Sequence, residues 1–442
     1  KLSSGSAMSK LYIQMNNTLV GVLEKSRGGS LALTYAESWI NSSYARSLSL
    51  SMPLTRTLYK GDVVNNFLEN LLPDNLFIRQ KIQQRFATKT DTAFDLLAAI
   101  GQDCVGAIQL TDRPVSSDKK LHYKPLSDAE LVKILDGYRT NPLGMLEEEQ
   151  DFRISLAGAQ EKTALLWYRA QWCLPLGNSP TSHIIKLPIG YLDYNGIDLS
   201  QSCENEWLCM QLIKAFGLPV ANTELLQVAG KTFLAVERFD RKWMLRPDGE
   251  TLLRLPQEDL CQAFGISPAL KYEADGGIGI KQALEILQGS QNAARDREDF
   301  FKSQIVFWLL AAPDGHAKNF SIFLEQNNAY RMTPFYDVLS AYPFMHAKGI
   351  PKQKLKMAMA LEGKSRHYLW NNIQPRHFIS TAKNAGYSSS LARQHLEEVL
   401  AKVPQVIQNV ESKLPVDFPK AISEAIFAGL KSKAEGALQG MF

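Results

Sequence analysis

Pro313-Asp-Gly-His-Ala-Lys-Asn-Phe-Ser321 is the stretch around which the rest of this sequence is organised. Residues 299–312 before it predict a helix whose end, 305–312, is the unbroken apolar run Ile-Val-Phe-Trp-Leu-Leu-Ala-Ala. We expect Pro313 to stop this helix and Gly315 to take a positive φ, because proline disfavours helical geometry before it and glycine has no Cβ. The charged residues would then lie on a tight loop fixed to a buried helix, a setting that favours chemistry.

Asp314 and Asn319 have the spacing of the aspartate and asparagine in a protein-kinase catalytic loop. Two short strands, 320–324 and 329–333, are predicted next, and they lead to Asp337. Phosphoryl transfer needs oxygen ligands for Mg²⁺ and an ionised proton acceptor near the attacking hydroxyl. The spacing alone is a weak signal because Asp-Gly and Asn-rich turns are common in loops. Together with Asp337 it predicts a phosphoryl-transfer site.

A second candidate phosphate loop lies at residues 154–163, Ile-Ser-Leu-Ala-Gly-Ala-Gln-Glu-Lys-Thr, followed by the predicted strand 164–168. Lys162 and Thr163 suggest a Walker A loop, but Glu161 stands where that motif has glycine, and a strand follows instead of a helix. A P-loop ATPase is therefore disfavoured. A strand-loop-strand lid that binds phosphates through backbone N–H groups fits better.

Lys186 lies in the predicted strand 184–187 between apolar neighbours, which is a natural setting for a ligand of the α- and β-phosphates. The alternative is an edge lysine with its ammonium in water. Glu206, on the predicted amphipathic helix 202–216, could orient Lys186. The strand 233–240 runs into a turn of the kind that holds adenine. The arginines in and after it, Arg238 and Arg241, fit a site role or structural ion pairs equally well.

Five motifs in this order along the chain resemble the HipA-type toxin kinases. They are Phe-Arg-Ile-Ser-Leu-Ala-Gly-Ala-Gln-Glu-Lys (152–162), His-Ile-Ile-Lys (183–186), Glu-Arg-Phe-Asp-Arg (237–241), Asp-Gly-His-Ala-Lys-Asn-Phe-Ser (314–321) and Pro-Phe-Tyr-Asp (334–337). The resemblance runs from about residue 8 to beyond 415. Pro313 departs from it, since a small or hydroxylated residue is expected there.

The resemblance implies an α+β fold of the two-lobed protein-kinase type, with a small N-terminal α/β subdomain and a mainly α-helical C-lobe. We expect the subdomain at 8–115, the kinase N-lobe at 116–253 and the C-lobe at 254–442. Residues 1–7, before Met8, are expected to be an expression scar.

The resemblance also implies ATP and Mg²⁺ as cofactors, Asp314 as the catalytic residue, and Asn319 and Asp337 as metal ligands. Glu206 would be the carboxylate that orients Lys186, and Ser155 the site of an inactivating autophosphorylation. The implied nucleotide-binding residues are Ala157, Gly158, Ala159, Gln160, Glu161, Lys162, Lys186, Val236, Glu237, Phe239, His316, Lys318, Asn319 and Asp337.

As partners, the resemblance implies a HipB-like helix-turn-helix antitoxin dimer and, within that complex, operator DNA on which the chain acts as corepressor. The implied substrate is a protein of translation, glutamyl-tRNA synthetase being the first candidate, and growth arrest with persistence is the outcome. Two alternatives remain. One is a kinase for small hydroxylated molecules, and the other is a catalytically silent corepressor scaffold.

Composition gives no reason to expect another class of protein. Hydrophobic residues make up 45% and charged residues 21%, which is ordinary for a globular protein. The net charge of 49 − 45 = +4 does not by itself indicate a nucleic-acid-binding surface. The five cysteines form no C-x-x-C pair and suit a reducing cytoplasm, where we expect the protein to act. No apolar run is long enough to predict a membrane span.

Several further elements are expected from local patterns. The alternating stretch 11–24 predicts a hairpin with its turn at Asn16-Asn17. A helix with an acidic first turn is expected at 257–264. Residues 271–277 are predicted to be a loop that either orders near the active site or, as the safer interpretation, is a plain surface loop. A further helix, 388–403, would be capped near Ser388 and ended by Pro404.

Overall fold

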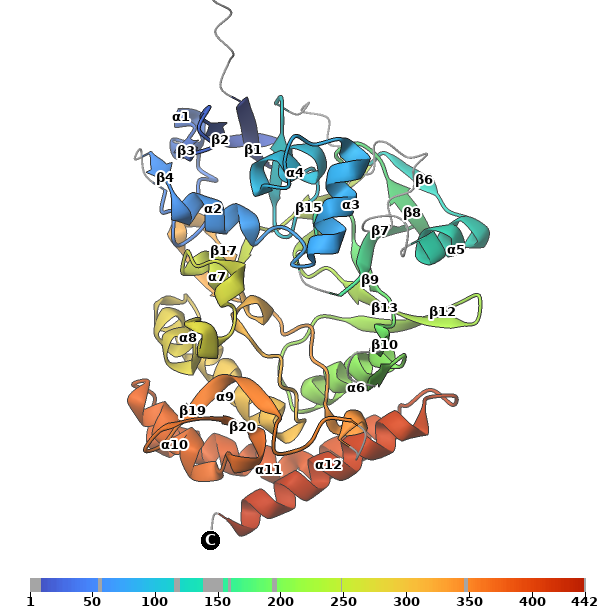
Figure 1. Ribbon diagram of the computed structural model, residues 1–442, viewed down its shortest axis with the longest axis vertical. Coiled ribbons are helices and arrows are strands. Elements are labelled where there is room, and N and C mark those ends of the chain that lie inside the picture. The colour runs from blue at the N-terminus through green and yellow to red at the C-terminus, as the bar shows by residue number, and fades with distance from the viewer. Residues whose placement is uncertain are drawn as a thin grey trace, which may run out of the picture. The chain divides into compact units, whose positions relative to one another are not determined.

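The computed structural model describes residues 9–54, 58–114, 120–137, 154–157, 160–192, 197–247, 249–345 and 349–440 (Figure 1). The chain divides into two compact units, each built from separate segments. Unit 1 comprises residues 1–185, 238–268 and 323–329, and unit 2 comprises residues 186–237, 269–322 and 330–442.

Unit 1 begins with a five-stranded antiparallel sheet in the order β4-β3-β2-β1-β5. Its hairpin β1–β2 turns at Asn16 and Asn17, whose φ values of 48° and 65° suit the two-residue turn that matches the twist of the strands. The predicted hairpin is confirmed. The elements of this region are β1 (Ser9–Met15), β2 (Thr18–Lys25), β3 (Leu31–Tyr35), α1 (Glu37–Ile40), β4 (Tyr59–Lys60), α2 (Asp62–Glu69), α3 (Leu76–Phe86), α4 (Ala93–Ile100) and β5 (Ile108–Thr111).

The rest of unit 1 holds strands in the order β9-β7-β8-β6, the hairpin β14–β15, strand β16 and the helices α5 and α7. Strand β7 starts at Lys162, two residues earlier than predicted. The elements are β6 (Tyr123–Pro125), α5 (Asp128–Asp136), β7 (Lys162–Tyr168), β8 (Gln171–Pro175), β9 (His183–Lys186, whose last residue belongs to unit 2), β14 (Arg241–Arg246), β15 (Gly249–Arg254), β16 (Gln257–Asp259) and α7 (Leu260–Ala263).

The prediction of a helix with an acidic first turn at 257–264 is wrong for the first residues of that range. Residues 257–259 form strand β16, and α7 begins only at Leu260. Asp259 is the N-cap of this helix, and its carboxylate accepts a hydrogen bond from the backbone N–H of Gln262 at 2.9 Å. Aspartate favours that position because its side chain satisfies a free N–H group of the first turn. The acidic pair therefore precedes the helix.

Glu258, beside this cap, is fully buried, and burial raises the pKa of its carboxyl group to about 8. Its Oε1 accepts a hydrogen bond from the backbone N–H of Leu50 at 2.8 Å, whereas its buried Oε2 has no hydrogen-bond partner among the described residues. Both observations fit a carboxyl group that stays protonated in the folded protein.

This protonation predicts a pH dependence of stability. Between the ordinary pKa of 4.5 and the folded value of about 8, the folded state holds a proton that the unfolded state releases. Stability is therefore lost as the pH rises, by up to about 1.4 kcal/mol per pH unit. Glu258→Gln is expected to remove this component in urea unfolding at pH values of about 5 and about 7. The exposed Glu250→Gln is the control, and parallel pH profiles for wild type and Glu258→Gln would contradict the assignment.

Unit 2 is mainly helical, and its long helix α11 packs against α6, α9, α10 and α12 (Figure 1). Its elements are β10 (Gly190–Leu192), β11 (Ile197–Leu199), α6 (Ser202–Ala215), β12 (Thr223–Val228), β13 (Lys231–Glu237), α8 (Ile280–Ile286), α9 (Ala293–Leu309), β17 (Ser321–Leu324, whose last two residues belong to unit 1), β18 (Tyr330–Met332), β19 (Lys356–Glu362), β20 (Arg366–Leu369), α10 (Pro375–Asn384), α11 (Ser389–Glu411) and α12 (Lys420–Gln439).

Two predictions about proline and one about glycine are corrected. Helix α9 ends at Leu309 instead of reaching Pro313, and Ala311 takes a φ of 48°. Gly315 does not have a positive φ. Helix α11 continues through Pro404 to Glu411. Its apolar face stays buried on both sides of the proline, so packing outweighs the one backbone hydrogen bond that Pro404 cannot donate.

Ser388 caps α11 as predicted, accepting a hydrogen bond from Leu391 N at 3.3 Å.

Throughout the described ranges, no helix has the length and apolar character to cross a membrane.

Candidate active site

The loop that follows α9 holds Asp314 in an exposed position on a rigid base. The Asp314 side chain is 59% exposed, while its backbone carbonyl accepts a hydrogen bond from Asn319 Nδ2 at 2.7 Å. The backbone N–H of Asn319 donates to the carbonyl of His316 at 2.9 Å. A Cβ on Gly315 would lie 2.8 Å from the Phe307 ring, so glycine is needed here for close packing and not for its φ. The loop thus presents one exposed carboxylate.

Residues 340–342 close the C-terminal end of α9 and tie it to the segment that carries Asp337. Ser340 Oγ donates to the carbonyl of Leu310 at 2.6 Å, and the other two residues donate to the carbonyls of Leu309 and Ala311. These carbonyls would otherwise lack partners at the helix end. Asn205 of α6 in turn exchanges two hydrogen bonds with the backbone of Ser340. The end of α9 that leads into the candidate catalytic loop, the segment that follows Asp337, and α6 are therefore joined by hydrogen bonds into one frame.

Lys186 lies between two carboxylates within this frame. Its Nζ donates to Glu206 Oε1 at 2.7 Å and to Asp337 Oδ1 at 2.6 Å. Lys186 and Glu206 are buried, whereas a third of the Asp337 side chain is exposed. Burial opposes the charge of Lys186, but Asp337 and Glu206 together raise its pKa above the ordinary value. The ammonium ion therefore stays charged at neutral pH and is held in one direction by its two carboxylate partners.

Asp337 and Asn319 are the residues that fit a divalent cation. Asp337 has a φ of 61°, a left-handed conformation that aspartate tolerates better than most residues. The amide nitrogen of Asn319 donates to the Asp314 backbone carbonyl, so only its side-chain carbonyl oxygen could serve as a metal ligand. Magnesium takes oxygen ligands, often from one or two protein side chains, and completes its shell with phosphates and water. Among the described residues, no group of three His, Cys, Asp or Glu side chains could form a protein-only metal cage.

His316 and Lys318, two predicted nucleotide-binding residues, are both buried in the loop. Burial lowers the pKa of His316, so its imidazole is neutral near pH 7, and its Nε2 lies 3.9 Å from Asp314 Oδ1. The backbone carbonyl of Lys318 accepts a hydrogen bond from Tyr336. A neutral histidine beside Asp314 can donate or accept a hydrogen bond but does not add charge there.

The two predicted adenine-site residues of unit 2 lie at the end of β13. Val236 is buried, whereas Glu237 is exposed and accepts a hydrogen bond from Asn222 Nδ2 at 2.8 Å. The backbone N–H of Glu237 also donates to the carbonyl of Asn222. The end of the strand is therefore fixed by one neighbouring residue.

Tyr272 contacts Asp314 directly, a contact that the sequence analysis did not assign to this residue. Its hydroxyl donates to Asp314 Oδ1 at 2.6 Å, and its ring lies edge-on to His316 with centroids 5.0 Å apart. Residues 271–277 therefore lie beside Asp314, as one of the two interpretations of this loop had it, and are not a plain surface loop. No periodicity or motif spacing in the sequence points to this contact, because Tyr272 and Asp314 are 42 residues apart.

Within unit 1, the predicted phosphate loop is described only at its ends. Lys162 is buried and its Nζ donates to the backbone carbonyl of Ala157 at 2.8 Å, which closes the loop. Gln160 and Glu161 are half-buried, and Gly158 and Ala159 lie outside the described residues. Elsewhere in unit 1, the ring of Phe239 lies edge-on to that of Phe323, with centroids 5.8 Å apart.

Ser155 is fully buried in unit 1. Its hydroxyl donates to the carbonyl of Leu71 at 2.7 Å, and its backbone N–H donates to the carbonyl of Asp103 at 3.1 Å. The hydroxyl is therefore committed to a structural hydrogen bond in this conformation.

Arg238 and Arg241, whose roles the sequence left open, are buried ion-pair partners. Arg238 donates to Asp240 and Arg241 donates to Asp103, each at 2.9 Å, and all four residues belong to unit 1. Arg254 reaches Asp103 as well, at 2.8 Å. Of the two roles that the sequence left open, both arginines therefore have the structural one, as ion-pair partners.

Comparison with known families gives matches over most of the chain. The model of the HipA N-terminal domain matches residues 11–111, and that of the HipA-like C-terminal domain matches residues 154–407. A Sinorhizobium fredii protein that carries the kinase name Y4mE is 30% identical over 90% of this chain and 91% of its own length. The serine/threonine-protein kinase toxin HipA of Shewanella oneidensis is 25% identical over 92% of this chain and 90% of its own length.

Among solved structures, the chain is similar to HipA of Shewanella oneidensis in a complex with HipB and its operator DNA. The TM-score is 0.80 at 23% identity, and the match covers 97% of each chain. The two chains therefore share their fold, which confirms the predicted kinase-like α+β class.

Proposed function

The chain belongs to the HipA family, and from this premise we propose that it is an Mg-ATP-dependent serine/threonine-protein kinase whose proton acceptor is Asp314. One observation carries the proposal. The buried Lys186 is held by Glu206 and Asp337 in the same frame that presents Asp314 on an exposed loop. A fixed cation, an oxygen ligand and an accessible carboxylate are what phosphoryl transfer requires. A scaffold protein would have no physical need for this arrangement.

In this mechanism each group has one role. Lys186 holds the α- and β-phosphates, and Glu206 keeps its ammonium directed at them. Asn319 and Asp337 hold Mg²⁺, which neutralises charge on the phosphates when it is bound. Asp314 orients the acceptor hydroxyl and takes its proton as the oxygen attacks. Lys318 is proposed to help neutralise the γ-phosphate.

The remaining nucleotide contacts stay predictions. Neutral His316 is proposed to hydrogen-bond the transferred phosphate, and the phosphate loop to bind through its backbone N–H groups. The phosphate-loop residues are Ala157, Gly158, Ala159, Gln160, Glu161 and Lys162, and the adenine-site residues are Val236, Glu237 and Phe239.

We propose that the kinase is the toxin of a toxin-antitoxin pair. The likeness to a HipA chain solved with HipB and operator DNA supports a HipB-like antitoxin dimer and operator DNA as partners, with the chain as corepressor. For the acceptor we propose a protein of translation, and glutamyl-tRNA synthetase is the first to test. Its phosphorylation would arrest growth and promote persistence.

We also propose that autophosphorylation at Ser155 switches the enzyme off. The Ser155 side chain is fully buried, so a phosphate carrying nearly two negative charges cannot occupy the same place. Both the reaction and its product therefore require residues around Ser155 to leave their positions. Phosphorylation would hold the phosphate loop out of its ATP-binding conformation.

Intact-mass measurement after incubation with Mg-ATP tests this function. Wild-type protein is expected to gain one phosphate that maps to Ser155, while Ser155→Ala gains none and keeps its activity for longer. If the wild type does not change mass, although it binds nucleotide and Ser155 starts unmodified, a small-molecule kinase or a silent scaffold becomes the better description.

A further inference from the structure

Residues 271–277 form a segment whose backbone is fixed against the catalytic loop. The carbonyl of Lys271 accepts a hydrogen bond from the backbone N–H of Ala317 at 3.1 Å. The backbone N–H of Gly277 donates to the carbonyl of Tyr272 at 3.0 Å. A Cβ on Gly277 would lie only 1.9 Å from the Leu270 carbonyl, so the turn admits no side chain there. Tyr272 is therefore held in place from both sides.

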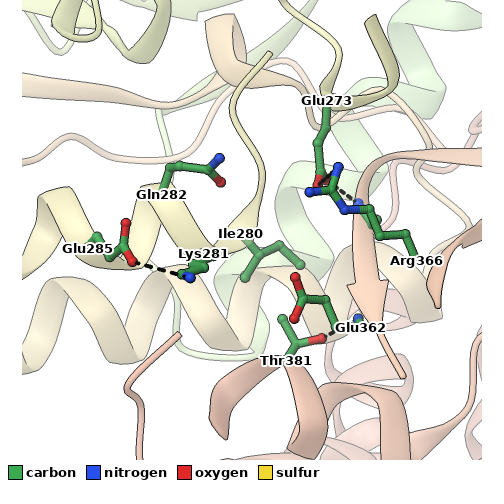
Figure 2. A pocket seen from close by; sticks show the side chains of 9 residues that line it. Glu273, Ile280, Lys281, Gln282, Glu285, Glu362, Arg366 and Thr381 are labelled. Atoms are coloured by element: carbon green, nitrogen blue, oxygen red, sulfur yellow. Dashed lines mark hydrogen bonds and ion pairs between the residues drawn. The ribbon is translucent and has the colours of Figure 1, made fainter. Parts of the chain in front are cut away.

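Strand β19 braces the same segment from a second direction. The backbone N–H of Ala360 donates to Glu273 Oε2 at 2.6 Å, and Ala358 N donates to the carbonyl of Pro313 at 2.9 Å. Glu273 also lies 3.7 Å from Arg366, on the wall of a cavity of about 300 Å³ (Figure 2). One strand thus contacts the residue before Asp314 and the residue after Tyr272.

The Tyr272 hydroxyl makes the contact that an acceptor must make. It donates to Asp314 Oδ1 at 2.6 Å, which is the length of a strong hydrogen bond from a hydroxyl to a carboxylate. A serine or threonine hydroxyl must lie within the same hydrogen-bond range of this carboxylate to lose its proton. Since Asp314 is exposed, water or a substrate could otherwise approach that oxygen.

We propose that the Tyr272 hydroxyl occupies the acceptor-hydroxyl site on Asp314 and is displaced when a protein acceptor binds. Tyr272 is then a positioning residue that keeps water from Asp314 Oδ1 and sets how strongly an acceptor must bind at that oxygen. The inference rests on the proposed role of Asp314. It adds that, in the resting enzyme, a hydroxyl of the chain itself occupies the position on Asp314 that an acceptor hydroxyl needs.

The substitution Tyr272→Phe tests this, because it removes only the hydroxyl and keeps the ring beside His316. We expect ATP hydrolysis without a protein acceptor to rise roughly 3- to 10-fold, since water can then bind at Asp314 Oδ1. With myelin basic protein as the acceptor probe, the acceptor KM is expected to fall by a similar factor, with kcat changing less than about twofold. A purely structural tyrosine would not lower KM.

Two further variants make the result specific. Tyr330→Phe is the matched control, because its hydroxyl donates to the carbonyl of Ile286 at 2.6 Å and not to Asp314. It should leave hydrolysis and KM at wild-type values. The double variant Tyr272→Phe, Asp314→Asn should lose the gain in hydrolysis.

Three outcomes would overturn the inference. Unchanged hydrolysis and KM in an active Tyr272→Phe protein would show that the hydroxyl does not compete with acceptors. A lower kcat at an unchanged melting temperature would make Tyr272 a catalytic aid instead. In both cases the proposed function stands. Absence of ATP turnover and of transfer in the wild type would overturn the proposed function and this inference with it.

Discussion

Asp314→Asn is expected to lower the rate of phosphoryl transfer by about 10²- to 10⁴-fold, the usual contribution of a positioned general base. The amide has the shape of the carboxylate but does not accept a proton at neutral pH. The loop should keep its form, because Asn319 bonds to the backbone carbonyl of residue 314 and not to its side chain. ATP affinity should therefore change little, and the loss should appear in the chemical step.

Single-turnover transfer of phosphate from labelled ATP to Ser155, followed by mass and by label, measures this step directly. Asp275→Asn is a suitable control because Asp275 is an exposed aspartate in the neighbouring segment 271–277. A transfer rate for Asp314→Asn within about threefold of wild type would remove Asp314 from the mechanism.

Asp103→Asn is expected to destabilise the protein by about 3–5 kcal/mol, the cost of removing one partner from a buried ion pair. Asp103 is buried and contacts three arginines, Arg238, Arg241 and Arg254, at 3.3, 2.9 and 2.8 Å. Burial would raise the pKa of its carboxyl group, but the arginines hold that pKa far below its usual value. The asparagine would leave three buried cations facing Asp240 alone.

The loss of stability should extend to the phosphate loop, since the carbonyl of Asp103 accepts a hydrogen bond from the backbone N–H of Ser155. Urea unfolding with the midpoint and slope fitted separately measures the loss of stability. Asp112→Asn is the control, because Asp112 is 75% exposed and lies 3.6 Å from Arg113, which is 86% exposed, a pair worth at most about 1 kcal/mol. A loss for Asp103→Asn that is no larger than the control's would show that the network is dispensable.

Local chemistry in the sequence determined much of the frame. Two asparagines that tolerate positive φ specified the turn of the first hairpin, and an unbroken apolar run marked the buried helix that precedes the catalytic loop. The spacing of Asp314, Asn319 and Asp337 indicated phosphoryl transfer, and the order of five motifs indicated the family. The catalytic and metal roles of these residues stay predictions until the kinetics are measured.

Where a local rule competed with packing, the sequence misled. Pro404 was expected to end a helix that continues past it, because the apolar face of α11 stays buried on both sides. Gly315 was expected to need a positive φ, yet it is glycine because the Phe307 ring leaves no room for a Cβ. Asp259 was placed in the first turn of a helix that it caps from outside.

The tertiary structure alone decided which polar groups meet. Tyr272 and Asp314 are 42 residues apart, Asn205 and Ser340 are 135 apart, and Asp103 and Arg254 are 151 apart. Periodicity shows which face of an element is apolar, but a buried polar contact repeats nowhere in the chain and so leaves no pattern. The two partners of such a contact come together only when the core packs, because each buried donor then needs an acceptor. The sequence therefore named the chemical groups, and packing decided which of them hold the candidate base.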